Sequence, residues 1–513
     1  MKKKHLIIPK TPYDSYESYL EESGPSALLK AKKIKPKIIL REIMRSGLRG
    51  RGGAGFSTGI KWKTLHKHSC PTKYVVCNAA EGEPGTFKDR YLIRKNPFAP
   101  LEGMLIAAHL LNAKEIYIGI KASFEREIDR LNHALQELKE RGFLNHIEIK
   151  IVQGPEEYLF GEEKALLNFI EEGSPLPREA DSPPYERGLF STATFDNPAL
   201  VNNLETFARI PGIIQHGGES FRTLGTEDTP GTVLFTLSGD IKNPGVYELE
   251  AGVTLRTLLN QVGGGGLNGE IKAVLSGVSN GVILPDKFDT PCDFGHLSLI
   301  GSGLGSAGFL VYDETRSIPR LAQAMARFLY VESCNQCTAC KFGLQMASSG
   351  LDTLLDKKSK KGDINRILYG ARSAPQGNRC YLPVEGSILI PSLLERFPDE
   401  FKEALDKKTS QTKPLLVPLI KDFDEKKRLF IYDKTFSRKN PDWTYEEEIP
   451  LKISVKPAKV ANGNFGIHLK PDILNGLKRH LIKKGLVPEG LVMDELVNDL
   501  LKEALQWRKN QRN

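Results

Sequence analysis

The chain has 513 residues, 40% of them hydrophobic and 26% charged, which is enough for several domains with sizeable cores. Its formal net charge of +9 is modest for this length; it suits nucleotides or an acidic partner and does not by itself indicate nucleic acid binding. The longest apolar stretch, 104–111, is too short to span a bilayer, and no apolar signal core follows the basic start, so we expect a cytoplasmic protein without direct membrane insertion.

The first part of the chain leads to a loop rich in glycine. Residues 1–35 are polar and rich in lysine, and we expect a tail that wraps the first domain. A helix is predicted at 37–44, closed by Gly47. The loop at 46–62 follows, and it contains Gly50, Arg51, Gly52, Phe56 and Lys61.

Glycine lets the backbone approach a ligand closely, and N–H groups beside cations suit a phosphate. The loop spells G-x-G-x-x-G, but a helix rather than a strand precedes it and no Gly-Lys-Ser/Thr follows. It therefore predicts a phosphate cradle that is neither the dinucleotide fingerprint nor a P-loop. A flexible glycine loop is the alternative.

Strands and helices then alternate, which indicates a layered α/β domain. Strands are predicted at 73–78, 115–120 and 147–152, and helices at 104–111 and 125–139, where apolar residues recur at helical spacing. Polar residues cluster where the first strand ends, namely Asn78, Glu81 and Glu83. The carboxyl end of a strand is a common place for a ligand in an α/β sheet.

Two further polar groups have both a structural and a ligand-binding interpretation. Gly161 stands where a helix begins, with Glu162 and Glu163 in its first turn; the acids complement the helix dipole or face the same ligand as the glycine loop. A proline-rich loop then leads to Tyr185. The second group is Asn202, Asn203 and Thr206, whose side chains could bind ribityl or ribose hydroxyls. Adjacent asparagines are, however, more often turn residues.

The next segment has a different pattern. After a boundary near 217–231, a hairpin with an Asn-Pro-Gly turn is predicted from a strand at 232–239 and a turn at 242–247, followed by a short helix within 255–266. This is a small β-grasp pattern with no obvious catalytic group.

From Ile318 the pattern becomes helical and leads to a cysteine cluster. The run C-x-x-C-x-x-C lets three thiolates converge from one loop, and a remote cysteine completes the set: Cys334, Cys337, Cys340 and Cys380. This spacing favours a [4Fe-4S] cluster, with structural zinc as the rival, since zinc sites more often use two separated pairs. We interpret Cys70, Cys77 and Cys292 as ordinary thiols.

With these motifs in place, the chain resembles the NADH-binding flavoprotein subunit of respiratory complex I. The same family supplies diaphorase subunits of soluble hydrogenases and formate dehydrogenases. The resemblance covers about residues 36–405 and rests on motifs in the family's order: Arg-Gly-Arg-Gly-Gly-Ala-Gly-Phe, Glu-Pro-Gly-Thr-Phe-Lys-Asp-Arg, Gly-Glu-Glu, Val-Asn-Asn-Leu-Glu-Thr and the cysteine cluster.

The resemblance implies an α/β fold of several domains. After the N-terminal tail these are a Rossmann-like FMN- and NADH-binding domain at 36–220, a β-grasp (soluble-ligand-binding) domain at 221–317 and a helical [4Fe-4S] domain at 318–405. Residues 406–513 lie outside the resemblance and form an α+β C-terminal extension of unknown role, with a strand at 464–471 and helices at 471–484 and 493–506.

The resemblance also implies cofactors and their ligands. The cluster would lie on the four cysteines named above. NADH would lie over the flavin, with Phe56 and Tyr185 near the adenine and with Glu83 and Glu163 as orienting groups near the nicotinamide half. FMN would be held by Gly50, Arg51, Gly52, Lys61, Asn78, Glu81, Gly161, Glu162, Asn202, Asn203 and Thr206.

The sequence departs from the family pattern at four places. Ala80 replaces an aspartate, Phe160 replaces a cysteine, and Thr64 stands where a second adenine-stacking aromatic is common. Arg379 lies beside Cys380, where a cation could raise the cluster's potential. None of these removes a cluster ligand or the glycine cradle.

The implied function is electron input: hydride from NADH reaches FMN, and single electrons pass to the [4Fe-4S] cluster and on towards quinone. The expected partners are a thioredoxin-like [2Fe-2S] subunit and further iron–sulfur subunits, which would place the chain in the cytoplasm at the periphery of the inner membrane. One alternative is the diaphorase of an NAD-linked hydrogenase or formate dehydrogenase. Another is a non-enzymatic scaffold whose C-terminal segment, faintly similar to ribbon-helix-helix modules, binds DNA.

Overall fold

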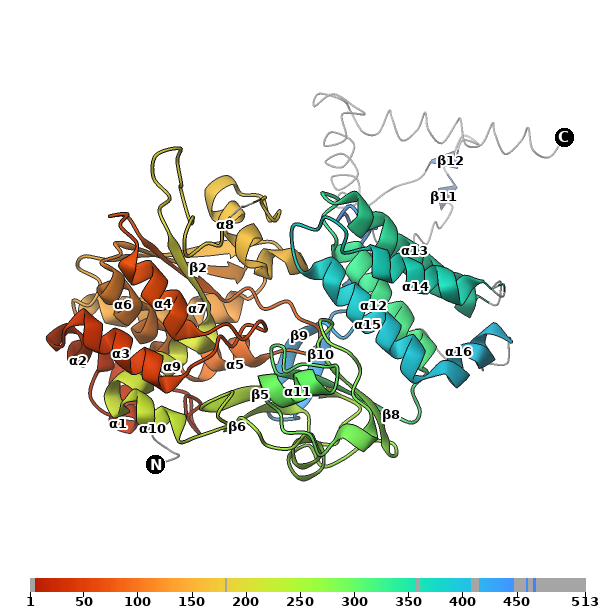
Figure 1. Ribbon diagram of the computed structural model, residues 1–513, viewed down its shortest axis with the longest axis horizontal. Helices are drawn as coiled ribbons and strands as arrows, with labels where there is room; N and C mark the ends of the chain where they lie inside the picture. The colour runs from red at the N-terminus through yellow and green to blue at the C-terminus, as the bar shows by residue number, and fades with distance from the viewer. Residues whose placement is uncertain are drawn as a thin grey trace. The chain divides into compact units, whose positions relative to one another are not determined.

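A computed structural model gives the structure of the chain. It describes residues 5–179, 182–356, 360, 362–406 and 415–446, together with two short strands further on. By its internal contacts the chain divides into two units, Met1–Glu446 and Glu447–Asn513. All elements up to η5 belong to the first unit (Figure 1).

A four-stranded parallel sheet forms the centre of the first domain, in the order β3-β2-β1-β4. Strands β1, β2 and β4 are mostly buried and rich in apolar residues, as expected of strands covered on both faces, whereas the edge strand β3 is largely half-exposed. Asn78 and Asn203 are partners in register, so the carboxyl ends of two strands meet at one edge. The strands are β1 (Tyr74–Asn78), β2 (Glu115–Lys121), β3 (Glu148–Gly154) and β4 (Ala199–Asn203), which confirms the three predicted strands.

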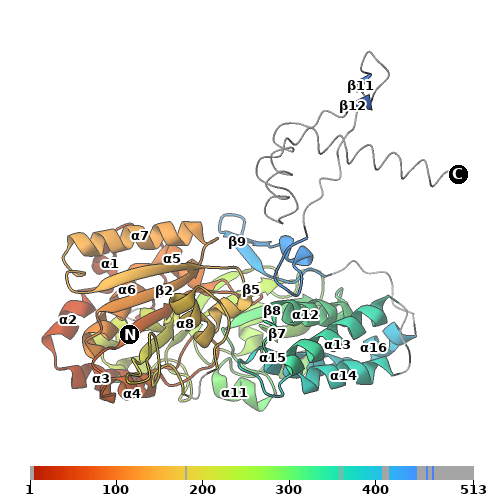
Figure 2. The ribbon, with the colours of Figure 1, turned by 90° about the horizontal axis from the view of Figure 1, so that it is seen from above.

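Helices cover both faces of this sheet; Figure 2 shows α7 on one side and α3 and α4 on the other. The predicted helices are confirmed, although the apolar helix α6 begins earlier, at Phe98. Gly47 ends α3 in the left-handed conformation, with φ 64°. The helices are α3 (Pro36–Ser46), α4 (Thr58–Lys67), α5 (Lys88–Lys95), α6 (Phe98–Leu111), α7 (Glu125–Glu140), α8 (Glu163–Glu172), α9 (Leu204–His216) and α10 (Gly218–Arg222), with the 3-10 turn η2 (Tyr158–Gly161) before α8.

The N-terminal segment packs into the first domain through two helices, α1 (Tyr16–Ser23) and α2 (Ala27–Lys33). The buried carboxylate of Glu102 on α6 accepts hydrogen bonds from the Tyr19 and Ser26 hydroxyls, at 2.8 and 2.6 Å, and from the backbone N–H of Leu28 at 2.9 Å. A buried charge with this many donors holds the segment in place.

The second domain is a four-stranded mixed sheet in the order β6-β5-β8-β7. Strands β5 and β6 form the predicted hairpin, while β5 pairs with β8 in parallel, an arrangement that gives the β-grasp pattern. The elements are β5 (Thr232–Gly239), β6 (Gly245–Glu250), the π-helical turn η3 (Thr257–Val262), β7 (Ile271–Ser276), η4 (Pro285–Lys287), α11 (Phe294–Leu299) and β8 (Gly308–Asp313).

The third domain is a bundle of helices, as predicted from Ile318 onward. Cys334 and Cys337 follow α12, Cys340 lies in the first turn of α13, and Cys380 precedes α15. The helices are α12 (Ile318–Glu332), α13 (Thr338–Leu355), α14 (Asp363–Ser373), α15 (Leu382–Arg396) and α16 (Pro398–Leu405).

Residues 415–446, which we call the strap, return across the first unit. They contain β9 (Ile420–Asp424), β10 (Leu429–Tyr432) and the 3-10 turn η5 (Thr435–Arg438). Phe423 and Phe430 pack against Phe87 in a small buried cluster, with ring centroids 6.2 and 5.9 Å from that of Phe87. The start of the predicted extension is thus part of the first unit.

In the second unit the structure describes an antiparallel pair, β11 (Ala458–Lys459) and β12 (Phe465–Gly466). The latter falls within the strand predicted at 464–471. The helices predicted at 471–484 and 493–506 lie outside the described residues. Among the described helices, none is long and apolar enough to cross a membrane.

Candidate functional site

A cavity of about 610 Å³ lies at the carboxyl edge of the first sheet. Three domains supply its wall: the glycine loop and strand ends of the first, a loop of the β-grasp domain, and the start of α15 in the helical domain. Of the residues expected to hold FMN, all except Arg51 line the cavity, as do Phe56, Glu83 and Glu163 of the expected NADH set.

The glycine loop forms a closed turn. The N–H of Gly50 donates to the carbonyl of Phe56 at 2.8 Å. Gly55 has a φ of +64°, and a Cβ there would lie 2.7 Å from the Phe294 ring, so both conformation and space require glycine. The result is a cradle bare of side chains, which fits a ligand that must approach the backbone.

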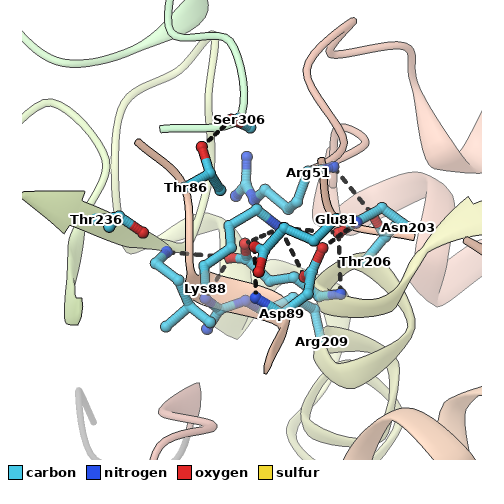
Figure 3. Close-up of polar contacts among 12 residues, drawn as sticks. Arg51, Glu81, Thr86, Lys88, Asp89, Asn203, Thr206, Arg209, Thr236 and Ser306 are labelled. Atoms are coloured by element: carbon cyan, nitrogen blue, oxygen red, sulfur yellow. Dashed lines mark hydrogen bonds and ion pairs between the residues drawn. The ribbon is translucent and has the colours of Figure 1, made fainter. Parts of the chain in front are cut away.

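Arg51 does not face the cavity. Its backbone N–H donates to the Thr206 hydroxyl at 2.9 Å (Figure 3). Its guanidinium donates to the carbonyls of Pro230 and Thr232 at 2.7 and 3.2 Å. Burial lowers the pKa of Arg51 to about 10. The side chain therefore joins the glycine loop to β5 rather than offering a cation to a phosphate.

Lys61 on α4 is a cation that does line the cavity. Its Nζ donates to the Val201 carbonyl at 3.0 Å and pairs with Glu163 Oε1 at 3.2 Å. Nearby, the rings of Phe56 and Tyr185 stack at 5.9 Å between centroids and 19° between planes, with Phe56 still 44% exposed. Of the two rings, Phe56 lines the cavity and Tyr185 does not.

Charged side chains of the cavity wall form a network of hydrogen bonds and ion pairs (Figure 3). Lys88 Nζ is buried, lies 2.8 Å from Asp89 and 3.2 Å from Glu205, and donates to Asn203 Oδ1 at 3.0 Å. Burial raises the pKa of Asp89 to about 6, although Lys88 opposes the shift. Glu81 accepts from the backbone N–H of Asp89 at 3.0 Å, so the network is tied to the strand end.

The predicted amides have structural partners as well as a cavity face. Asn78 Nδ2 donates to the Gly161 carbonyl at 2.7 Å, and Asn203 caps α9 by accepting from the N–H of Glu205 at 3.0 Å. With its amide turned, Asn202 accepts from Trp62 Nε1 at 3.0 Å. These asparagines therefore stabilise the local structure and also line the cavity.

The same is true of the acids at α8. Glu162 caps the helix by accepting from the N–H of Ala165 at 2.8 Å, and it also lines the cavity. Burial raises the pKa of Glu162 to about 7, and the charge of Glu163 adds to the shift. A Cβ on the preceding Gly161 would lie 2.8 Å from the Ala80 carbonyl oxygen, so this glycine permits close packing.

Sequence reasoning missed two parts of the wall. The β-grasp domain, in which no catalytic group was expected, contributes Ser279, Asn280 and Ser306, and Ser306 Oγ lies 2.9 Å from Thr86 Oγ1. The helical domain contributes Tyr381 and Glu385. The Ser-Asn-Gly turn after β7 was the only signal for the first group.

The four cysteines of the predicted cluster gather at one end of the helical domain. Cys340 is buried in its core, and the other three pack against that core partly buried. Burial raises the pKa of Cys340 to about 12, with the negative charges of Cys334 and Cys337 adding to the shift. Burial likewise raises the pKa of Cys380.

Among the described residues, no group of three or more His, Cys, Asp or Glu side chains is already arranged around a metal position. Tyr381 and Leu382, which follow Cys380 in the chain, line the large cavity together with the glycine loop.

The strap fixes the cysteine loop from outside. Lys341 Nζ donates to the carbonyls of Ser333 and Pro441, at 3.0 and 2.7 Å. The buried Lys439 Nζ lies 2.7 Å from Glu332 Oε1, and the other oxygen of Glu332 accepts from the backbone N–H of Tyr158 at 2.8 Å. The strap thereby connects the segment before the cysteines to the wall of the cavity.

The departures from the family pattern lie as follows. Ala80 is buried on the cavity wall, and Phe160 packs edge-on against Phe169 with centroids 5.0 Å apart. Thr64 is half-buried on α4. Arg379 donates to Gln336 Oε1 at 3.2 Å and pairs with Glu179 at 3.3 Å, so its charge is partly offset.

Comparison with known proteins agrees with this site. Three family models match the chain in order: the Nuo51 FMN-binding domain at 43–212, the SLBB domain at 234–280 and the NADH-ubiquinone oxidoreductase-F iron-sulfur binding region at 320–404. Fold and site together define an NADH dehydrogenase flavoprotein that binds FMN and a [4Fe-4S] cluster, and the predicted cofactors and fold class are confirmed.

Relatives place the chain more narrowly. The NADH-quinone oxidoreductase F chain of Aquifex aeolicus is 35% identical over 77% of this chain and 92% of its own length. The NADP-reducing hydrogenase subunit HndC of Solidesulfovibrio fructosivorans is 32% identical over 77% and 81%. An NAD⁺-reducing [NiFe]-hydrogenase structure covers 77% of this chain and 67% of its own, at 28% identity with a TM-score of 0.69. The chain belongs to the NADH-quinone oxidoreductase F family, so the predicted resemblance is confirmed.

Proposed function

We propose that this chain is the electron-input subunit of an NADH:quinone oxidoreductase. It takes a hydride from NADH and passes single electrons to its cluster and on towards quinone. The observation that carries the proposal is the single cavity bounded both by the glycine loop and by the residues that follow Cys380. Bound FMN supplies the exchange between a hydride and single electrons, which neither a nicotinamide nor an iron–sulfur cluster performs alone.

The chain's own residues bind and orient. Gly50 and Gly52 leave room for the flavin nucleotide, and Lys61 offers a cation to its phosphate. The other residues assigned to FMN lie at strand ends and helix starts and would hold the ring and its polyhydroxyl chain: Asn78, Glu81, Gly161, Glu162, Asn202, Asn203 and Thr206. We infer that Arg51, expected to hold FMN, supports the site through its contacts with Thr206 and with the carbonyls before and in β5.

NADH would enter over the flavin. The exposed face of Phe56, backed by Tyr185, offers a surface for stacking of the adenine. Glu83 and Glu163 line the cavity and are assigned to orienting the nicotinamide half. The four thiols Cys334, Cys337, Cys340 and Cys380 would hold the [4Fe-4S] cluster beside this cavity.

Partners follow from the chemistry. Electrons that leave the cluster singly need a further one-electron carrier, and we assign this role to iron–sulfur subunits, one of them a thioredoxin-like [2Fe-2S] subunit. Such an assembly would hold the chain at the cytoplasmic periphery of the inner membrane. The names of the relatives support a multisubunit complex.

The diaphorase of a hydrogenase is the second candidate. It is favoured by the likeness to HndC and to the NAD⁺-reducing hydrogenase. Co-purification separates the two candidates: a hydrogenase subunit captured with this chain from its native cells would support the diaphorase, and quinone-reducing membrane subunits would support the first assignment.

The test of the proposed function is anaerobic titration of the reconstituted holoprotein with NADH. The flavin absorbance should bleach and the cluster should become reduced. Glu83→Gln should weaken NADH turnover by about tenfold while the flavin stays bound, since a carboxylate that only orients is not needed to hold FMN. Loss of flavin from Glu83→Gln would overturn the role of Glu83, and a flavin that NADH never bleaches would support the non-enzymatic scaffold.

A further inference from the structure

A second carboxyl group lies close to Glu83 on the cavity wall. The hydroxyl of Tyr158, on η2, is 2.5 Å from Glu83 Oε2 and 3.0 Å from Glu385 Oε1. Glu385 comes from the first turns of α15, in the helical domain, and is 6% exposed. Three groups from three distant segments therefore form one chain of oxygens: Glu83, Tyr158 and Glu385.

The number of protons in this chain is limited. A neutral phenol has one proton and can donate to only one of the two carboxyl groups. The other contact is a hydrogen bond only if a carboxyl group donates to the phenol oxygen. If both glutamates were ionised, one oxygen–oxygen contact would carry no proton and would be repulsive. The geometry thus requires one protonated carboxyl group.

The surroundings indicate which carboxyl group holds it. Glu83 has other donors, since the N–H of Val278 bonds to its Oε1 at 2.7 Å and the Ser279 side chain also donates to it. Glu385 Oε2 is buried without a hydrogen-bond partner. Burial, and then the charge of Glu83, raise the pKa of Glu385 well above its ordinary value.

The charged and titratable groups on neighbouring elements do not favour an ionised Glu385. Tyr381, just before its own helix, is a phenol and offers no cation to Glu385. On α12, Glu332 accepts the backbone N–H of Tyr158, and its charge is balanced by Lys439. Lys121 interacts electrostatically with Glu156 and Glu332.

We propose that Glu385 is a positioning residue that carries a proton and donates it to Tyr158, which in turn donates to Glu83. Glu83 is then the one carboxylate of the three, held at a fixed place as an acceptor for an N–H donor of the ligand. The proposal rests on the proposed function in one respect, namely that the nicotinamide half of the nucleotide binds beside Glu83. It also means that the helical domain, through α15, sets the position of a nucleotide-binding group.

Infrared spectroscopy of the holoprotein tests where the proton lies. At about pH 8, Asp89 and Glu162 have lost their protons because their pKa values are about 6 and about 7, so the protonated carboxyl of this pair should stand out. A carboxylic acid carbonyl band should be present in the wild type, absent in Glu385→Gln and retained in Glu83→Gln. A band lost in Glu83→Gln and kept in Glu385→Gln, or no band in the wild type, would overturn the proposal.

Nucleotide binding tests the positioning role. The oxidised holoprotein is titrated with NAD⁺, so that no turnover occurs. Glu385→Leu, which is neutral but cannot donate, should bind NAD⁺ about five- to tenfold more weakly, because Tyr158 loses a buried donor. Glu385→Gln, whose amide can donate to Tyr158, should recover most of that loss.

The outcomes of the two measurements are separable. Equal weakening in both Glu385 variants, or none in Glu385→Leu with its flavin and cluster spectra intact, would overturn the positioning role. Wild-type protein that does not bind NAD⁺ at all would count against the proposed function, while the infrared bands would still report on the proton. Tyr158→Phe offers an independent variant, which should lower the affinity for NAD⁺ to a similar extent as Glu385→Leu.

Discussion

The cavity and the strap occupy neighbouring places in the structure but differ in how the sequence encodes them. The cavity is built from short motifs, in which glycines, acids and amides lie next to strand ends and helix starts. The strap is built from pairs far apart in the chain, such as Lys439 with Glu332 and Pro441 with Lys341. Ligand sites of this kind are thus visible as local patterns, while the supports that hold them are visible only in three dimensions.

The largest effect is expected from removal of a cluster ligand. Cys380→Ser should reduce the iron content and the cluster absorbance of the purified protein by about tenfold or more, because a hydroxyl is a poor replacement for a thiolate on iron. The flavin should remain, since the glycine loop does not depend on Cys380.

Cys70→Ser is the matched control, because Cys70 lies in the first domain and contacts Asn197 rather than the cluster ligands. Iron bound at wild-type level by Cys380→Ser, with the same spectrum, would contradict the ligand assignment.

Release of the strap should have the next largest effect. Lys439→Met leaves Glu332 buried without its cation, and the free energy of unfolding should fall by about 3–5 kcal/mol. The cluster should also be lost faster to a chelator, because the segment before Cys334 is less well held. Chemical denaturation and the rate of cluster bleaching measure the two effects.

The double variant with Glu332→Gln should recover part of this loss, because it removes the unpaired charge. If Lys439→Met were as stable as the wild type and kept its cluster equally long, the strap would be a passive covering.

A smaller change acts on the cavity alone. Gly161→Ala adds a Cβ that would lie 2.8 Å from the Ala80 carbonyl oxygen, and such overpacking costs about 1–3 kcal/mol. FMN affinity should fall by about 5- to 150-fold while the cluster is retained. Fluorescence titration of the flavin-free protein measures it. Gly362→Ala, where a Cβ meets nothing within 4 Å, is the control and should bind FMN normally.

The smallest effect concerns pH. The folded pKa of Glu162 is raised to about 7, so the folded chain binds this proton more tightly than the unfolded chain, and stability falls as pH rises from 4.5 to about 7. Glu162→Gln keeps the helix cap and removes the titration. In the flavin-free wild type, the free energy of unfolding should fall by about 1 kcal/mol over this pH range, a small value because water in the cavity screens the charge. In Glu162→Gln this fall should disappear, which melting temperatures measured across the pH range would show. An unchanged decline would assign it to another group, Asp89 being the nearest candidate.

Much of the fold and of the site was predictable. The strands at 73–78 and 115–120, the hairpin at 232–239 and the helical onset at 318 follow from periodicity and turn residues, and the structure confirms them. The direction of a long side chain did not follow: Arg51 is drawn to the carbonyls of Pro230 and Thr232, which belong to another domain.

What the sequence did not predict depends on long-range contact. Nothing near Glu385 in the chain marks it as part of the cavity wall, because its partner Tyr158, which also contacts Glu83, is supplied by a different domain. Ser279 and Ser306 were missed for the same reason. The strap falls within the predicted extension because its buried Phe423 and Phe430 lie in strands of five and four residues, which are too short for the sequence to indicate their partner.

The order in which the wall of the cavity is synthesised has a consequence for maturation of the protein. The glycine loop leaves the ribosome first, but the wall is complete only when α15 has folded, and Pro441 reaches Lys341 later still. The wall that flavin would contact is therefore complete only after synthesis has passed α15, so flavin would be bound after translation of the helical domain rather than by the first domain alone.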